Sequence, residues 1–235
     1  MKKLIFLFCL TMISSLLCAQ QQDASSPLPE NWDTLLDAYK GDKYYLPKES
    51  DVKLTSEIVI SEIDGLISKE LFLRSDQIQF RTIVLKNWQS LQSTVKQASA
   101  YSLLFANRYE PELKIGLTLY EKSALPSEFD EQSMLALCAG LRTHYRARDI
   151  EFLMPPGNVK ASGYFASLLS SPTFKTDIQY RKPTDPRVIL RNISFYFSTG
   201  DYAIVATMEG PSALVEINNE TLESFLRNLS VYTPE

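Results

Sequence analysis

The clearest pattern in the chain is VILRNISFYFSTGDYAIVATM, residues 188–208. Two runs rich in aromatic and β-branched residues, Val188 to Ser198 and Tyr202 to Met208, flank the short connection Thr199-Gly200-Asp201. Aromatic and β-branched side chains favour strands, and a short glycine-containing connection between two such runs is typical of a hairpin. The segment therefore predicts two antiparallel strands.

A helix is expected after this hairpin. Leu222, Phe225, Leu226 and Leu229 recur at i, i+3, i+4 and i+7, which is the spacing of one helix face. Asparagine is a preferred residue at helix N-caps, so the pattern predicts a final helix that begins at Asn219.

Two more helices are predicted nearer the N-terminus. The first covers about residues 32–39 and ends before Gly41. The second covers about residues 128–145, with Ser127 as its N-cap and Asp130 near the positive end of the helix dipole. Both have apolar residues at helical spacing, and acidic side chains are stabilising in a first helical turn.

Between these helices the apolar residues change to a period of two, which indicates strands. Val52 to Ile60 alternates, and Asp64-Gly65 separates it from the strand-like run Leu66 to Leu73 as a hairpin turn would. Another run covers Ile78 to Leu85. Clean alternation from Leu113 to Leu119 predicts a half-buried strand.

The two halves of the chain share short segments in the same order. Residues 78–81 (IQFR) resemble 178–181 (IQYR), and 83–87 (IVLKN) resemble 188–192 (VILRN). Such matches indicate a tandem duplication of a helix-plus-sheet unit, and chance similarity between strands is the alternative. The duplication favours strands for Trp88 to Phe105, whose apolar residues also fit a helix.

The predicted fold class is therefore α+β: an antiparallel sheet covered by about three helices, with a tandem duplication as the finer prediction. The predicted domains are a signal peptide (residues 1–19), a linker (20–29), a first α+β unit (30–124) and a second α+β unit with a C-terminal capping helix (125–235).

The N-terminus predicts export. Met1-Lys2-Lys3 precedes an apolar stretch that ends at Cys18, and the small residue Ala19 follows. This is the pattern of a secretory signal peptide cleaved after Ala19, and about 15 apolar residues are too few to span a bilayer. The alternative is a lipid anchor on Cys18, but a lipoprotein signal needs a small residue where this chain has Leu17.

The cysteines agree with a chain that needs no disulfide. Of three cysteines, Cys9 and Cys18 lie in the predicted signal peptide, which leaves Cys138 alone. A single cysteine forms no intrachain bridge. The apolar neighbours of Cys138 predict a buried, unreactive thiol.

Charge argues against nucleic acid as a partner. The chain has 24 basic and 28 acidic residues and a net charge of −4, and removal of Lys2 and Lys3 makes the mature chain more acidic. A net negative chain lacks the basic surface that nucleic acids and anionic lipids attract. We therefore expect a soluble protein that is at most peripheral to a membrane.

One cluster of residues at the end of the second predicted helix is a candidate ligand site. Arg142, His144, Arg146 and Arg148 follow one another at alternate positions. Arg142 and Arg146 are four residues apart and share a helix face, and guanidinium groups bind carboxylate or phosphate in a fork. The alternative reading is that these cations only complement the negative end of the helix dipole.

No pattern in the chain indicates an enzyme. His144 is the only histidine, so a Ser-His-Asp triad would have to use it, and no serine lies in a Gly-x-Ser-x-Gly turn. We find no metal-ligand spacing and no glycine-rich phosphate loop, and we predict no cofactor. The predicted function is an exported, periplasmic or secreted, non-enzymatic binding or accessory module of the cell envelope, with a protein or a small molecule as its partner. The alternative is an exported hydrolase whose site assembles only in three dimensions.

Overall fold

The computed structural model describes residues 32–40, 45, 52–63, 66–91, 101–127, 130–146, 151–152, 157–160, 167–168 and 171–232. Three α-helices lie in these ranges: α2 (Trp32–Ala38), α3 (Glu131–Arg146) and α4 (Ser212–Arg227). The first strands and one short 3-10 helix are β1 (Thr55–Ile63), β2 (Leu66–Arg74), β3 (Gln79–Ile83), β4 (Trp88–Ser90), β5 (Leu103–Asn107), β6 (Lys114–Glu121) and η2 (Lys122–Ala124). The later strands are β7 (Glu151–Phe152), β8 (Gly157–Lys160), β9 (Ser167–Leu168), β10 (Ser171–Pro172), β11 (Phe174–Lys182), β12 (Asp185–Thr199), β13 (Tyr202–Pro211) and β14 (Ser230–Tyr232).

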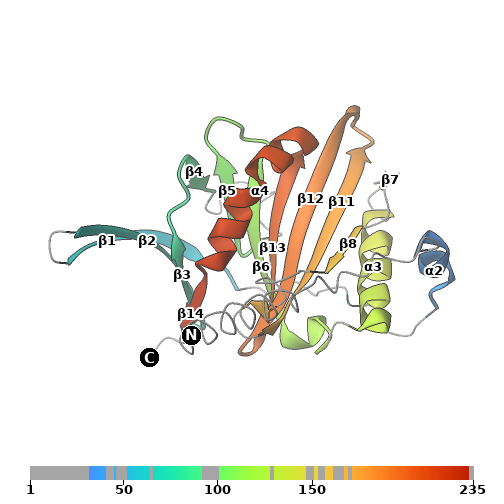
Figure 1. Cartoon of the computed structure of the whole chain (residues 1–235), viewed down its shortest axis with the longest axis horizontal. Coiled ribbons are helices and arrows are strands. Elements are labelled where there is room, and N and C mark those ends of the chain that lie inside the picture. Colours follow the sequence, from blue (N-terminus) through green and yellow to red (C-terminus); the bar gives the residue numbers. More distant parts are fainter. Residues whose placement is uncertain are drawn as a thin grey trace, which may run out of the picture.

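The larger sheet is antiparallel and has eight strands, in the order β4-β5-β6-β13-β12-β11-β7, with β8 also paired to β11. Its centre is the predicted hairpin (Figure 1). Thr199 pairs with Tyr202 across the two-residue loop Gly200-Asp201. Gly200 has a positive φ of 52°, a conformation that glycine adopts without steric cost. The hairpin is confirmed, and both of its strands extend beyond the predicted ends.

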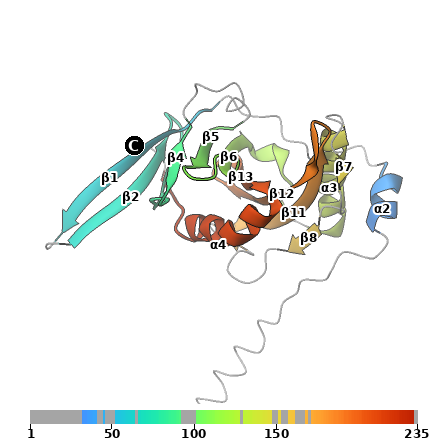
Figure 2. The same ribbon diagram turned by 90° about the horizontal axis from the view of Figure 1, so that it is seen from above.

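The smaller sheet has four antiparallel strands in the order β1-β2-β3-β14. Its first three strands confirm the predicted strands between residues 52 and 85. Ile63 pairs with Leu66, so β1 and β2 form the predicted antiparallel pair, while the predicted turn residues Asp64 and Gly65 lie outside the described residues. The chain returns to this sheet at its C-terminal end, where Ser230 in β14 pairs with Arg81 in β3. The β1–β2 hairpin projects from the body of the protein (Figures 1 and 2), and we call it the arm.

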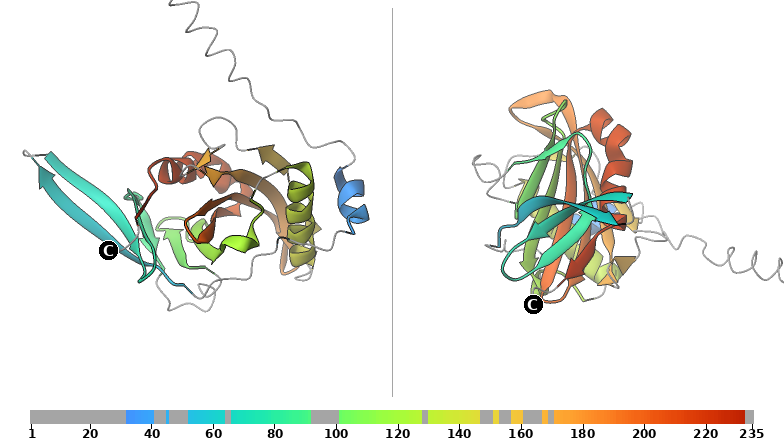
Figure 3. Two further views of the ribbon diagram at one scale, coloured as in Figure 1. Left: turned by 90° about the horizontal axis from the view of Figure 1, so that it is seen from below. Right: turned by 90° about the vertical axis from the view of Figure 1, so that its left-hand side faces the viewer.

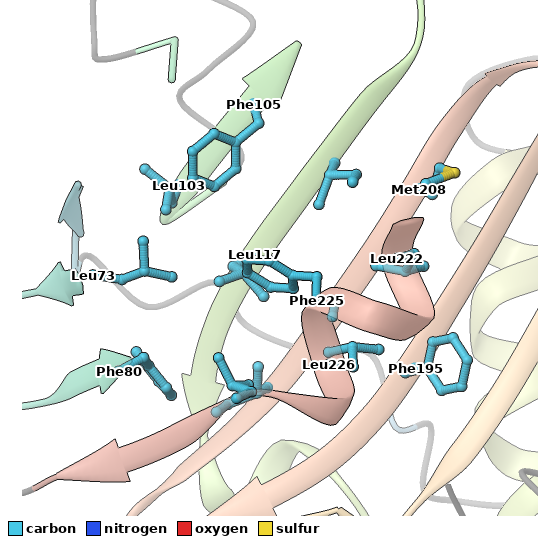
Figure 4. Close-up of a cluster of buried hydrophobic side chains, with 14 of the residues drawn as sticks. Leu73, Phe80, Leu103, Phe105, Leu117, Phe195, Met208, Leu222, Phe225 and Leu226 are labelled. Atoms are coloured by element: carbon cyan, nitrogen blue, oxygen red, sulfur yellow. The ribbon is translucent and has the colours of Figure 1, made fainter. Parts of the chain in front are cut away.

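The main core lies where α4 meets both sheets. Alternate residues of β13, namely Ile204, Ala206 and Met208, face α4, which contributes the buried Leu222, Phe225 and Leu226 (Figure 4). The Phe225 and Phe105 rings meet edge to face, with centroids 6.4 Å apart. Leu73 and Phe80 of the smaller sheet belong to the same cluster. This shared core fixes the base of the arm to the larger sheet.

A second core lies on the opposite face of the larger sheet, against α3. Leu137, Cys138 and Leu141 of α3 are buried with Tyr196 and Val205 of the sheet. Cys138 is a free thiol, and its burial raises its pKa to about 12. The predicted buried, unpaired cysteine is therefore confirmed.

Two helix starts were predicted wrongly. The final helix begins at Ser212, and Asn219 lies inside it, where its amide donates to Glu223 Oε1 (3.3 Å). The prediction was based only on the apolar residues of the last two helical turns. The buried Val215 lies seven residues before Leu222 on the same face, and it would have extended the predicted helix towards its N-terminus. In α3 the capping residue is Asp130, not Ser127. Asp130 Oδ1 accepts the Ser133 N–H (2.7 Å), and this hydrogen bond lowers the Asp130 pKa.

Two strand predictions need adjustment. The strand β6 is buried on both faces, since Ile115 and Thr118, which point to opposite sides, are both buried. Half-burial was predicted because alternation does not reveal what packs on the more polar face of β6, where the Tyr101 ring lies against Gly116. Residues 88–105, predicted as extended, form strands at both ends, and residues 92–100 lie outside the described part of the chain.

The duplication is not confirmed. Residues 79–81 belong to β3 of the smaller sheet, whereas the matched residues 178–181 belong to β11 of the larger sheet. Asn87 has a positive φ of 66° before β4, whereas its predicted counterpart Asn192 is a buried residue within β12. The larger sheet takes strands from both sides of residue 124, and the division of the chain into two units stays a prediction.

Candidate functional site

The structure brings together two of the predicted ligand residues, but around a carboxylate of the same chain. Arg142 Nη1 lies 3.0 Å from Asp37 Oδ1, and Arg146 Nη2 lies 3.7 Å from the same oxygen. Asp37 belongs to α2, which packs beside α3 (Figure 1). The shared face of the two arginines was predicted correctly. Asp37 takes the position that an anionic ligand would need, so this pair joins α2 to α3.

Of the other two predicted residues, the structure describes only His144. The His144 ring packs edge to face on Tyr145, with centroids 6.0 Å apart, and residues two apart on a helix point in different directions. Arg148 lies outside the described residues. Within the described ranges, no group of three or more His, Cys, Asp or Glu side chains is arranged to hold a metal ion.

A buried polar network, which the sequence analysis missed, lies on the α3-facing side of the larger sheet. Tyr180 OH donates to Glu209 Oε1 (2.5 Å), and the Asn192 amide donates to Glu209 Oε2 (3.3 Å). Ser194 Oγ donates to Asn192 Oδ1 (2.7 Å) and lies 2.8 Å from Thr207 Oγ1. A serine hydroxyl has one proton, so Thr207 donates to Ser194. These groups satisfy one another, which indicates a structural role within the sheet.

Two buried tyrosines on this face predict a stability loss at alkaline pH. Burial, followed by the Glu209 charge and hydrogen bond, raises the pKa of Tyr180 above its usual range, and burial raises that of Tyr196 to about 12. In the unfolded chain both tyrosine side chains would ionise at about pH 10. Their contribution to stability is therefore complete below about pH 10 and is lost as the pH rises beyond it.

Alkaline titration followed by phenolate absorbance and circular dichroism tests this prediction. We expect the absorbance of Tyr180 and Tyr196 to appear together with unfolding, and the Tyr196→Phe variant to lack part of that late increase. Complete tyrosine ionisation in a protein that keeps its folded spectrum would contradict it.

A polar pocket of about 380 Å³ lies where the arm leaves the body, between β2, β3 and the end of α4. The residues that line it are Ser68, Lys69, Glu70, Arg81, Thr82, Ile83, Arg227, Asn228 and Ser230. Two of its cations already have partners, since Arg81 lies 3.5 Å from Glu70 and Arg227 lies 3.4 Å from Glu223. The pocket therefore offers a partly neutralised polar surface rather than a strong anion site.

The arm carries exposed isoleucines on one face. Cross-strand pairing sets Ile58 opposite Leu71 and Ile67 opposite Glu62, so residues of even number in β1 share a face with residues of odd number in β2. At the base of the arm this face is core, because Leu71 and Leu73 are 4% and 0% exposed. Farther out it is open to solvent. We call the exposed part the apolar arm face, after its isoleucines Ile58 (54% exposed), Ile60 (63%) and Ile67 (68%). Two charged residues share this face, because Lys69 pairs with Ile60 and Glu62 pairs with Ile67.

The opposite face of the arm combines the charged Glu57, Glu70 and Arg74 with the apolar Val59 and Phe72. Arg74 pairs with Glu57 (3.1 Å), and its guanidinium lies over the Phe72 ring, 4.8 Å from the centroid. The left view of Figure 3 shows that the arm stands away from the rest of the protein. The sequence alternation predicted these strands, but it does not distinguish an apolar face that meets the core from one that meets solvent.

Comparison with known proteins identifies no family. No family model matches the chain, and no curated protein matches it. Among the described residues, no helix has both the length and the apolar character needed to cross a membrane.

Several solved structures resemble the chain at low identity. Cyanobacterial PsbP from Synechocystis sp. PCC 6803 is 10% identical, with 76% of this chain and 94% of that chain covered and a TM-score of 0.43. LpqN, involved in cell envelope biogenesis of Mycobacterium tuberculosis, is 8% identical (77% and 92% covered, TM-score 0.42). The Saccharomyces cerevisiae Ran-binding protein Mog1p is 9% identical (75% and 96% covered, TM-score 0.38). With TM-scores below 0.5, these likenesses do not assign a function to this chain.

Proposed function

We propose that the chain is an exported, non-enzymatic accessory module that binds a protein partner through the apolar arm face. The observation that carries this proposal is the exposure of Ile58, Ile60 and Ile67 on a projecting hairpin. Single exposed apolar residues are common and need no explanation. Here three isoleucines continue a face whose inner part is core, and an apolar surface of this kind is typical of an interaction site.

The energetics favour a protein partner over a small ligand. Removing an isoleucine side chain from water stabilises a complex by about 1.5–3 kcal/mol when burial is complete. Three such side chains on one face supply the apolar centre of an interface. None of them lines the described pocket beside the arm, and small molecules bind in concave sites that enclose most of their surface.

Export is supported by the signal-peptide pattern of residues 1–19, which lie outside the described residues. The proposed mature chain begins near Gln20, is periplasmic or secreted, and carries no lipid on Cys18. Arg142 and Arg146, with His144 and Arg148, stay the candidate residues for an anionic ligand. That role requires a ligand to displace Asp37 from the two arginines. The hydrolase alternative has no specific observation in its favour among the described residues.

The test places a photo-crosslinking amino acid at Ile67 in cells that produce the protein. We expect a discrete cross-linked product from Ile67, and none from the matched control at Ile217, which is as exposed (78%) but lies on α4. The same cells supply the protein for cell fractionation and intact-mass measurement, which test export and cleavage. No product from Ile67, or equal products from Ile67 and Ile217, would contradict binding through the arm. An intact mass that retains residues 1–19, or that includes a lipid, would contradict the proposed processing.

A further inference from the structure

The strand β1 forms an edge of the smaller sheet, and no described strand pairs with its outer side. An edge strand exposes backbone N–H and C=O groups, and proteins that avoid edge pairing use Pro, Lys, bulges or short strands there. The sequence of β1, TSEIVISEI, has no Pro, Lys or Arg. Its nine residues pair with β2 without a register shift. The strand is therefore long, regular and open to pairing.

Building on the proposed function, we infer that its protein partner is a second copy of this chain, and that the two β1 strands pair antiparallel about a two-fold axis at Val59. The sequence of β1 has an isoleucine on each side of this residue, Ile58 and Ile60. Antiparallel pairing centred there sets Ile58 of each copy opposite Ile60 of the other. It also sets Glu57 opposite Ser61, and Glu62 opposite Ser56, so no carboxylates face each other.

Neighbouring registers are less favourable. Side chains in a strand alternate between faces, so a shift by one residue would join the apolar arm face of one copy to the opposite arm face of the other. If the axis lay midway between Val59 and Ile60, Glu57 of one copy would also lie directly opposite Glu62 of the other. Moving the axis from Val59 to Ile60 would set Ile58 opposite Glu62. The arrangement centred on Val59 keeps both apolar faces on one side and pairs isoleucine with isoleucine.

The pairing is compatible with the contacts already present in the arm. Glu57 keeps its ion pair with Arg74, because this pair lies on a face of the sheet rather than along its edge. The isoleucines of β1 from the two copies then meet at the centre of the joined faces, with Lys69 beside Ile60 and with Glu62 and Ile67 farther out in each copy. Cross-strand pairs of this kind each contribute about 0.2–1 kcal/mol, in addition to the backbone hydrogen bonds.

Mass measurement by light scattering over a wide concentration range is the first test. We expect a dimer for the wild-type chain and a monomer for Ile60→Glu, which places a charge opposite Ile58 of the other copy and faces Lys69 within its own arm. The matched control Ile217→Glu changes an exposed isoleucine (78%) on α4, and it should remain dimeric. Thermal unfolding, measured where the wild type is monomeric, should change little in both variants because neither residue is buried. A wild-type monomer at all concentrations, or an Ile60→Glu dimer, would overturn the inference.

Disulfide formation tests the register. The background carries Cys9→Ser and Cys18→Ser, so that the buried Cys138 is the only other thiol. Residues opposite each other in an antiparallel pair lie within disulfide reach. We expect Val59→Cys to form a covalent dimer on mild oxidation. Ser61→Cys should not, because its copies would be four residues, or about 13 Å, apart along the strands. Equal linkage of both variants would overturn the register.

The outcomes separate this inference from the proposed function. A cross-linked product from Ile67 with twice the mass of the chain supports both. A product of a different mass, from a chain that light scattering shows to be monomeric, supports binding through the arm and overturns the second copy as the partner. The absence of any product from Ile67, together with a monomeric chain, overturns both.

Discussion

The Phe225→Ala variant is expected to lose about 3–5 kcal/mol of stability, the usual cost of truncating a buried phenylalanine. Phe225 is fully buried where α4 meets both sheets (Figure 4). Its ring packs on Phe105, and its backbone carbonyl accepts the Thr82 hydroxyl (2.8 Å). A loss of this size is a large share of the 5–15 kcal/mol that typically separates folded from unfolded protein.

Urea unfolding measures this loss, and Ile217→Ala on the same helix is the matched control. Ile217 is mostly exposed, so its truncation should change the free energy of unfolding by less than about 0.5 kcal/mol. Because β3 and β14 share this core with the larger sheet, both sheets should unfold in one transition. A loss below about 1 kcal/mol in Phe225→Ala, or separate transitions for the two sheets, would show that this cluster does not join them.

The parts of the fold that sequence predicts well are those with strong local signals. The β12–β13 hairpin has long β-branched and aromatic runs around Gly200, and the last turns of α4 repeat their apolar residues at helical spacing. The start of α4 was missed because Val215, on the same face, was left out of the pattern. The packing of β3 against β14 was not predicted, since it joins segments that are far apart in the chain.

The candidate sites also depend on contacts between segments that are far apart in the chain, which sequence patterns do not predict. Spacing along a helix places Arg142 and Arg146 on one face, but no local pattern shows that Asp37 fills the position between them. In β12 the polar Asn192 and Ser194 alternate with apolar residues, as on a strand with one solvated face, yet both are buried. In β1 a similar alternation has Ile58 and Ile60 exposed. Burial depends on what packs against a face, and local sequence does not contain that information.

The Glu209→Ala variant is expected to lose about 1–3 kcal/mol, because it removes the acceptor of two hydrogen bonds. Glu209 accepts the Tyr180 hydroxyl through one oxygen and the Asn192 amide through the other. Tyr180 and Asn192 are both buried, but the Glu209 side chain is 27% exposed, so water reaches part of the space that the carboxylate leaves. The cost comes mainly from the two donors that lose a charged acceptor.

The matched control is Glu216→Ala on the exposed side of α4. The Glu216 carboxylate is 76% exposed and lies 4.0 Å from Arg191, and exposed ion pairs of this kind contribute about 0–1 kcal/mol. A second measurement separates the hydrogen-bond network from simple loss of packing. Glu209 acts after burial to raise the pKa of Tyr180, so in Glu209→Ala the Tyr180 phenolate should appear at a lower pH and before the loss of the circular dichroism signal, with which it appears in the wild type. Equal stability of Glu209→Ala and Glu216→Ala, with an unchanged alkaline titration, would show that the network does not stabilise the larger sheet.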